Sequence, residues 1–117
     1  MGEKSKDIID IMKFKYGQEN LRIPVPDKYE NEMFGIVSHV LGGSRMNVQS
    51  ADGKSRLARI PGKMRRRVGR FRIGDLIILS PWEIQNEKAD IIYRYRKNQI
   101  RFLLNRKLIP NKLENMI

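Results

Sequence analysis

The pattern of hydrophobic and polar positions divides the chain near residue 32. Residues 1–31 mix charges of both signs, and the segment 22–27 holds two prolines, which favour extended backbone over helix. We therefore predict a flexible N-terminal arm. Four apolar residues in this arm recur at helical spacing, so a short amphipathic helix is the alternative: Ile8, Ile9, Met12 and Tyr16.

From residue 32 onward, short apolar runs are separated by turn signals, as in a small all-β sandwich or barrel. Gly and Pro residues mark the turns between these runs. The segment 63–68, between Pro61-Gly62 and Gly69, is long enough for a short helix. The runs predict five strands, at 33–41, 45–51, 54–60, 76–79 and 89–95. Three strands, a short helix and two strands are the order of an OB-fold, a five-stranded Greek-key barrel.

The second and third strands meet at Asp52-Gly53, a pair that favours a two-residue hairpin turn. Such a turn would pair Val48 with Leu57 and Gln49 with Arg56. Polar residues of both strands would then share one exposed face: Arg45, Asn47, Gln49, Lys54 and Arg56. In the last strand, alternation predicts one shared face for Ile91, Tyr93 and Tyr95.

Beyond the barrel, apolar residues recur at i, i+3, i+4 and i+8, the stripe of an amphipathic helix: Ile100, Leu103, Leu104 and Leu108. We expect this helix to dock on the barrel and to end before Pro110, with a loose tail after it. The predicted organisation is an arm (1–31), an OB-fold RNA-binding domain (32–96), a C-terminal helix (97–109) and a tail (110–117).

Charge concentrates in one segment. Residues 54–72 hold nine Lys or Arg and no acid, whereas the whole chain has 24 basic and 13 acidic residues. The rest of the chain has 15 basic and 13 acidic residues and is therefore nearly neutral, so the excess charge is local. A local excess creates a directed field, and its natural partner is a polyanion.

Several function classes find no support. The chain has no cysteine, which excludes disulfides and thiolate chemistry, and it has one histidine, His39, with no nucleophile or carboxylate at a readable spacing. Phosphate-loop, dinucleotide and metal-ligand motifs are absent from the sequence, so we predict neither an enzyme nor a bound cofactor or metal. The longest aliphatic run has four residues against the roughly 20 that span a bilayer, and we expect a cytoplasmic protein.

The predicted hairpin face offers no aromatic residue, although proteins that bind single strands usually expose several. We therefore expect a folded RNA contacted through its phosphates. Four aromatic residues lie in or beside apolar segments and are predicted to pack in the core or under the helix: Trp82, Tyr93, Tyr95 and Phe102. Phe71 lies between Arg70 and Arg72, which makes it a candidate for stacking on a base.

Short motifs in a fixed order make the sequence resemble archaeal translation initiation factor 1A, which is related to eukaryotic factor 1A and bacterial initiation factor one. The most specific motifs are Asp52-Gly-Lys54, Arg59-Ile-Pro-Gly-Lys63, Gly74-Asp75, Pro81-Trp-Glu83 and Glu87-Lys-Ala-Asp90. The resemblance covers about residues 32–108.

The resemblance implies an OB-fold with a C-terminal helix that occupies the A site of the small ribosomal subunit, contacts decoding-centre rRNA and helps to place initiator tRNA. It implies a monomer that acts with other initiation factors and makes or breaks no bond. From the resemblance and the predicted basic face together, the expected RNA-binding residues are Arg45, Asn47, Lys54, Arg56, Arg59, Lys63, Arg65, Arg66, Arg67 and Arg70.

The chain departs from the family pattern in two places. Residues 68–71 read Val-Gly-Arg-Phe where family members usually carry a Trp, and the arm is longer and less basic than expected. The tail at 113–117 is apolar at its end, and we hypothesise that it contacts the large initiation GTPase, as the eukaryotic tail does.

Three other functions compete with this interpretation. A general RNA chaperone of the cold-shock type would use the same barrel to bind any single strand. A constitutive ribosomal protein would fit the charge equally well. A small nuclease would need acids within the basic segment 54–72, which has none.

Overall fold

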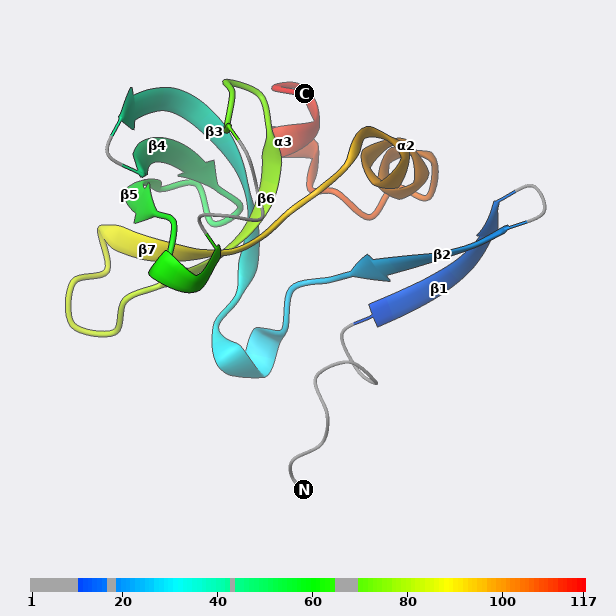
Figure 1. The fold of residues 1–117 in the computed structure, drawn as a ribbon, viewed down its shortest axis with the longest axis horizontal. Coiled ribbons are helices and arrows are strands. Elements are labelled where there is room, and N and C mark those ends of the chain that lie inside the picture. Colours follow the sequence, from blue (N-terminus) through cyan, green and yellow to red (C-terminus); the bar gives the residue numbers. More distant parts are fainter. Residues whose placement is uncertain (1–10, 17–18, 43, 65–69) are drawn as a thin grey trace.

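A computed structural model describes residues 11–16, 19–42, 44–64 and 70–117 (Figure 1). Residues 65–67 of the basic segment, and residues 8–10 of the alternative N-terminal helix, lie outside the described residues. The strands are β1 (Ile11–Tyr16), β2 (Glu19–Pro24), β3 (Met33–Gly42), β4 (Arg45–Ser50), β5 (Ser55–Arg59), β6 (Leu76–Pro81) and β7 (Lys88–Arg94). The helices are η1 (Lys28–Glu30), η2 (Gly62–Met64), α2 (Lys97–Asn105) and α3 (Asn111–Glu114).

Strands β3 to β7 close into a barrel in the order β3-β4-β5-β7-β6, with β6 pairing back onto β3. All pairs are antiparallel except β5 and β7, which run parallel. The long strand β3 serves two partners: residues 33–36 pair with β6, and the stretch from Gly35 to Gly42 pairs with β4. Two bulges bend β3 along its pairing with β4. The predicted OB-fold is therefore confirmed.

Two hydrophobic cores share the wall made by β3 and β6. The first fills the barrel, with Val37, Val48 and Leu79 among its fully buried members. The second lies outside the wall, over Ile36 and Ile78. Because β6 is covered on both faces, its sequence is a continuous apolar run instead of an alternation.

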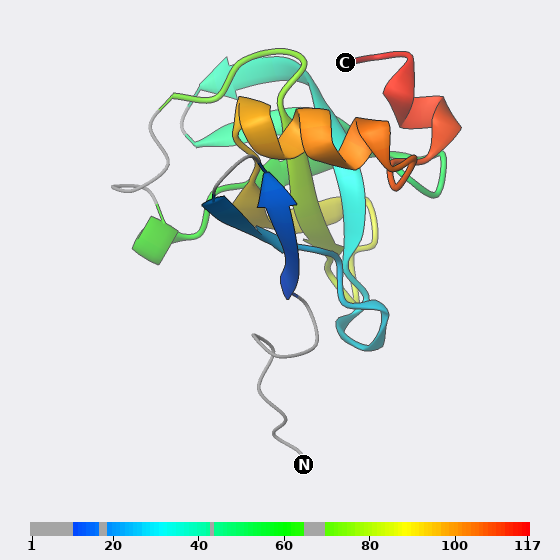
Figure 2. The ribbon, with the colours of Figure 1, turned by 90° about the vertical axis from the view of Figure 1, so that its right-hand side faces the viewer.

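Helix α2 covers the outer core and lies across the barrel wall (Figure 2). The predicted docking helix is confirmed, and three of its four predicted stripe residues pack in or against the outer core: Ile100, Leu103 and Leu104. The helix ends at Asn105. Phe102 and Leu103 are buried, whereas Leu108 lies beyond the helix and is exposed. The chain then turns back through Lys107, whose φ is 57°, so Leu108 cannot continue the helical stripe.

The expected loose tail contains a further helical segment, α3, which packs on the barrel. Its Leu113 is fully buried in the outer core beside Ile109. The residues that follow, including Met116 and Ile117, present apolar side chains to solvent. The apolar end of the sequence therefore has two roles, because Leu113 anchors it and the residues after it remain exposed.

In the arm, β1 and β2 form an antiparallel hairpin, so the helix alternative is wrong for residues 11–16. The arm contacts the barrel at the last two residues of β2. Ile23 is fully buried in the outer core, and the Tyr95 hydroxyl donates a hydrogen bond to the Pro24 carbonyl. Burial raises the pKa of Tyr95 well above its usual range, so this hydroxyl remains a donor.

The predicted shared face of the last strand is also wrong. A bulge at Ile92 shifts the β6–β7 register, so that Ile91 pairs with Leu79 and Tyr93 pairs with Ile78. Ile91 consequently lies in the barrel interior, while Tyr93 and Tyr95 pack in the outer core in edge-to-face contact. The bulge lets one strand supply large side chains to both cores.

Candidate nucleic-acid interface

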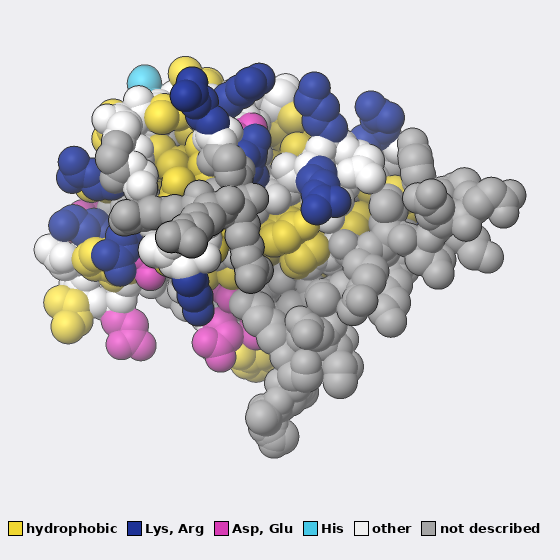
Figure 3. All heavy atoms as spheres, in the orientation of Figure 1, with side chains coloured by type: hydrophobic (Ala, Val, Ile, Leu, Met, Phe, Trp, Pro, Cys, Tyr) yellow, Lys and Arg dark blue, Asp and Glu magenta, His cyan; other side chains and the backbone are white. Residues whose placement is uncertain are grey.

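The outer face of the β4–β5 hairpin carries a pair of arginines. Arg45 lies directly opposite Arg59, and both are exposed. Next along this face are the pairs Asn47 with Leu57 and Gln49 with Ser55. Basic side chains spread over the upper and left parts of the surface in Figure 3, and acidic ones gather at its lower edge.

The structure contradicts the predicted place of Arg56 on this face. The loop between the strands is longer than two residues, with Gly53 at a φ of 92°, and it shifts the register by one position. Val48 therefore pairs with Arg56, not Leu57, and Arg56 is turned to the barrel side and is 3% exposed.

Arg56 is instead the centre of a structural network. Its terminal nitrogens donate to both carboxylate oxygens of Asp52 at 2.9 Å each. Its Nε donates to the Asn86 carbonyl at 2.7 Å and one Nη to the Asn86 side chain at 2.8 Å. The Arg56 hydrogen bond, more than any other cause, lowers the pKa of Asp52. These contacts hold the loop between β4 and β5 to the loop before β7.

Beside Arg59 lies a cluster that the sequence analysis missed. Asp90 on β7 pairs with Arg59 and accepts from its Nε at 2.8 Å. The same carboxylate oxygen accepts from the Trp82 indole nitrogen at 3.0 Å. The Arg59 guanidinium lies 4.9 Å from the centre of the Trp82 ring, and the Lys88 ammonium lies 5.5 Å from it. Trp82 is half-buried on the surface, so its predicted place in the core is wrong.

The other predicted residues lie at separate positions. Lys54 is exposed after the hairpin loop, Lys63 is exposed in η2, and Arg70 is exposed before Phe71. Arg65, Arg66 and Arg67 lie outside the described residues. The structure thus brings Arg45 and Arg59 together and leaves Arg56 out of the exposed face.

Phe71 does not stack on a base, because it is 5% exposed and lies in the core of the barrel. The Arg94 guanidinium lies 5.1 Å from its ring centre. The flanking Arg70 and Arg72 are both exposed, which is the alternation of an extended chain with one buried position. Tyr95 and Phe102 are buried, as predicted.

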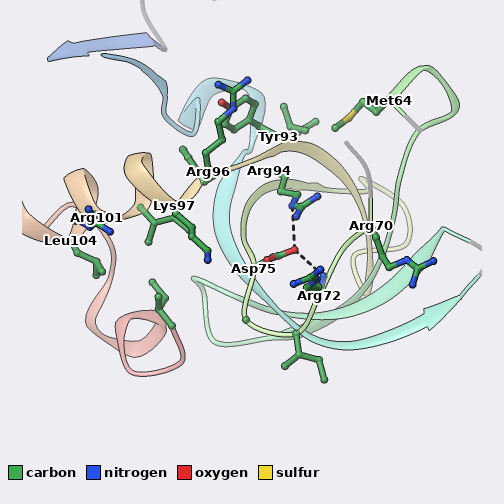
Figure 4. A pocket seen from close by; sticks show the side chains of 16 residues that line it. Met64, Arg70, Arg72, Asp75, Tyr93, Arg94, Arg96, Lys97, Arg101 and Leu104 are labelled. Atoms are coloured by element: carbon green, nitrogen blue, oxygen red, sulfur yellow. Dashed lines mark hydrogen bonds and ion pairs between the residues drawn. The ribbon is translucent and has the colours of Figure 1, made fainter. Parts of the chain in front are cut away.

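A groove of about 1320 Å³ lies between the 70–75 segment and α2 (Figure 4). Ile92, Tyr93 and Ile100 contribute to its apolar lining. Asp75 is its acidic residue, held by Arg94 at 3.2 Å and by the Arg72 backbone N–H at 2.9 Å. The cations that line it are Arg70, Arg72, Arg94, Arg96, Lys97 and Arg101. The dense run of cations at 94–97 is the sequence signal that would have indicated it.

Other kinds of site are not found in the described ranges. Among these residues, no three His, Cys, Asp or Glu side chains are grouped so that they could hold a metal ion. In the same part of the chain, no helix is long and apolar enough to cross a membrane. His39 is exposed on β3.

Comparison with known proteins gives a consistent result. The family model "Translation initiation factor 1A / IF-1" matches residues 19–116. Translation initiation factor 1A of Thermoplasma acidophilum is 43% identical over 116 residues, which cover 94% of this chain and 97% of the relative. The Pyrococcus abyssi protein of the same name is 47% identical over 91 residues, covering 77% and 78%.

Among solved structures, the bacterial translation initiation factor one from the Wolbachia endosymbiont of Brugia malayi has a TM-score of 0.45 and 26% identity. That match covers 62% of this chain and 85% of that one. The family match extends over the barrel and the helices that cover it. The chain therefore belongs to the translation initiation factor 1A / IF-1 family, as its short motifs indicated.

Proposed function

We propose that the protein binds the small ribosomal subunit at decoding-centre rRNA in the A site and promotes initiator tRNA placement and assembly of the preinitiation complex. The family is one of initiation factors and is non-enzymatic. The mechanism is therefore occupancy: a rigid barrel carries a basic face into an RNA site and keeps other ligands out of it. The proposed factor acts as a monomer in the cytoplasm, without a cofactor.

The exposed Arg45–Arg59 pair carries this proposal. Like charges directly opposite each other in a sheet destabilise it, so this pair weakens the fold on its own. A bound polyanion makes the same pair favourable, because phosphates between or beside the two guanidinium groups attract both and offset their repulsion. Lys54, Lys63 and Arg70 add exposed charge around the pair. We assign RNA contact to these residues and to Asn47. Arg56 is not assigned RNA contact, because it is buried.

The basic run Arg65, Arg66 and Arg67 belongs to the same proposed interface by sequence. We expect that changing all three to Ala abolishes subunit binding and leaves the thermal midpoint nearly unchanged, as it would if their charges serve RNA binding and not the fold. If this variant unfolds, the three arginines are structural.

Chemical footprinting of purified small subunits tests the proposed function. Subunits are probed at near-physiological salt with the wild-type protein, with the triple Arg variant and with Arg45→Ala/Arg59→Ala. The proposal predicts protection confined to decoding-site rRNA that both variants lose. Diffuse protection, or equal binding to unrelated single strands, would favour the RNA-chaperone alternative of the cold-shock type. Binding that resists salt washing would favour a constitutive ribosomal protein.

We also propose that the end of the chain contacts the large initiation GTPase. The exposed apolar side chains of Met116 and Ile117 support this contact, whereas Leu113 is anchored in the outer core. Removal of residues 115–117 should therefore weaken association with the GTPase without unfolding the protein. The matched control is Ile84→Ala, which removes an exposed apolar side chain elsewhere. Unchanged association after the truncation would end this proposal.

A further inference from the structure

We propose that Trp82 and Asp90 are positioning residues that fix the guanidinium group of Arg59 so that its two terminal nitrogens bind an RNA phosphate. This inference rests on the proposed RNA-binding function. It adds two residues that are not themselves cationic to the interface. It also assigns Arg59 the role of a pre-organised phosphate ligand, in contrast to a mobile surface charge.

The Arg59 guanidinium is held from two directions. The Asp90 carboxylate accepts from Nε at 2.8 Å, which fixes the group along one edge. The Trp82 ring, with its centre 4.9 Å from the guanidinium carbon, restricts its tilt. Trp82 is itself oriented by the same Asp90 oxygen, at 3.0 Å from its Nε1. One carboxylate therefore orders both the cation and the aromatic surface beside it.

The edge of the guanidinium that remains matches a phosphate. Of its five N–H groups, Asp90 takes the one on Nε. The four on the terminal nitrogens have no partner among the described residues, and the side chain is 54% exposed. Two parallel N–H groups on these nitrogens are the fork that binds a phosphate in a bidentate manner. Because the group is already ordered, less side-chain entropy is lost when the phosphate binds.

Stability alone gives a weak reason for this arrangement. A half-exposed ion pair contributes about 0–1 kcal/mol. Asp90 lies on one side of Arg59 in the sheet and Arg45 on the other, so the carboxylate offsets part of the repulsion between the two arginines. A simple neutralising role for Asp90 is the competing explanation. The two explanations predict opposite effects on RNA affinity when Asp90 is removed.

Asp90→Ala is the decisive variant, measured as the Kd for purified small ribosomal subunits. It removes a negative charge from the basic face, so an interface that depends only on charge would bind RNA more tightly. Loss of positioning instead predicts weaker binding, by about tenfold, the loss expected for one charge-assisted hydrogen bond. Tighter binding by Asp90→Ala would overturn the inference. Thermal unfolding of each variant checks that it is folded.

A double-mutant cycle tests whether Trp82 acts through Arg59. Trp82→Leu should weaken binding several-fold in the wild-type background, in keeping with a cation–π contact at an exposed site. In the Arg59→Ala background the same change should have almost no effect, because there is no guanidinium left to position. Arg59→Lys should not rescue binding, since it restores charge without the fork. An equal loss in both backgrounds would show that Trp82 contacts RNA or stabilises the fold by itself.

The control variant is Ile84→Ala, an exposed change in the loop that follows Trp82, which should leave affinity unchanged. If Arg45→Ala weakens binding but Asp90→Ala strengthens it, the inference fails and the proposed function survives. If the wild-type protein does not bind the subunit, both fail together.

The chain offers an independent readout in the free protein, because Trp82 is its only tryptophan. Arg59→Ala and Asp90→Ala should each change its emission spectrum, and Arg45→Ala should not. Subunit binding should also change the emission of the wild-type protein. Identical spectra for the wild-type protein and Arg59→Ala would contradict the stacked arrangement in solution.

Discussion

Replacing Arg56 with Ala separates a structural arginine from the RNA-binding ones. Arg56 is 3% exposed and donates four hydrogen bonds to Asp52 and Asn86. Breaking a buried ion pair from one side costs about 3–5 kcal/mol. Because the Asp52 side chain is 34% exposed and recovers water contacts, we take the lower end, about 3 kcal/mol. For a domain of this size that loss lowers the Tm by about 10 °C.

The assay pairs thermal unfolding with subunit binding. Arg45→Ala is the matched control, because it removes an exposed arginine from the same hairpin. We expect Arg56→Ala to lower the Tm and, at temperatures where it is folded, to keep the affinity and its salt dependence. Arg45→Ala should not lower the Tm, and it should weaken subunit binding. If Arg56→Ala leaves the Tm within about 2 °C of the wild-type value and weakens binding, the two-residue turn and its register are correct.

Three further predictions follow from the cores, the Asp52 ion pair and the basic face. Leu113→Ala should destabilise the protein by about 2–5 kcal/mol in urea unfolding, because it empties a fully buried site; a change below about 1 kcal/mol would mean that α3 is detached in solution. The lowered pKa of Asp52 means that its ion pair stabilises the fold fully above the usual Asp pKa of about 4 and progressively less as pH falls below it. The stability difference between wild type and Asp52→Asn should therefore be constant near neutral pH and shrink in acid, and a constant difference down to about pH 2 would contradict this account. If about six basic residues contact phosphate, affinity should fall on the order of 10³-fold between 50 and 200 mM salt, and a flat response would contradict the basic face as the interface.

The strand order and the barrel were predictable because apolar runs and turn residues recur along the chain in a regular way. The register of the β4–β5 hairpin was not. Asp52-Gly53 indicates a turn but does not show whether Ala51 belongs to it. Adding one residue to the loop shifts the register by one position, and every side chain of β5 then changes face. The local pattern also misleads, because Leu57 lies on the outer face and Arg56 on the inner one. The buried arginine is explained by two partners together, the nearby Asp52 and the distant Asn86.

The sequence was enough to predict which segment carries the basic residues of the candidate site. It was not enough to predict which side chains lie next to each other there. Arg59 and Asp90 are 31 positions apart in sequence, and they meet because β5 and β7 pair in parallel. Phe71 looked exposed because both its neighbours are arginines, but in extended backbone the side chains beside a buried residue point outward. The hairpin in the arm was missed although Gly17 follows Tyr16 in the sequence, and Gly at the first position of a two-residue loop favours a hairpin turn. Its anchor, Ile23, follows from tertiary packing.

The two cores on either side of the β3–β6 wall determine how the protein can be divided. Phe34, Ile36, Leu76 and Ile78 are at most 9% exposed, and their cover comes from the segments before and after the barrel. A fragment that ends at residue 96 would keep every barrel strand but would expose a contiguous apolar surface to water, and this surface would promote self-association. The minimal unit that covers both cores is therefore the barrel together with the end of the arm and the C-terminal helices, and shortened variants for crystallography or binding work should retain Ile23 and Leu113.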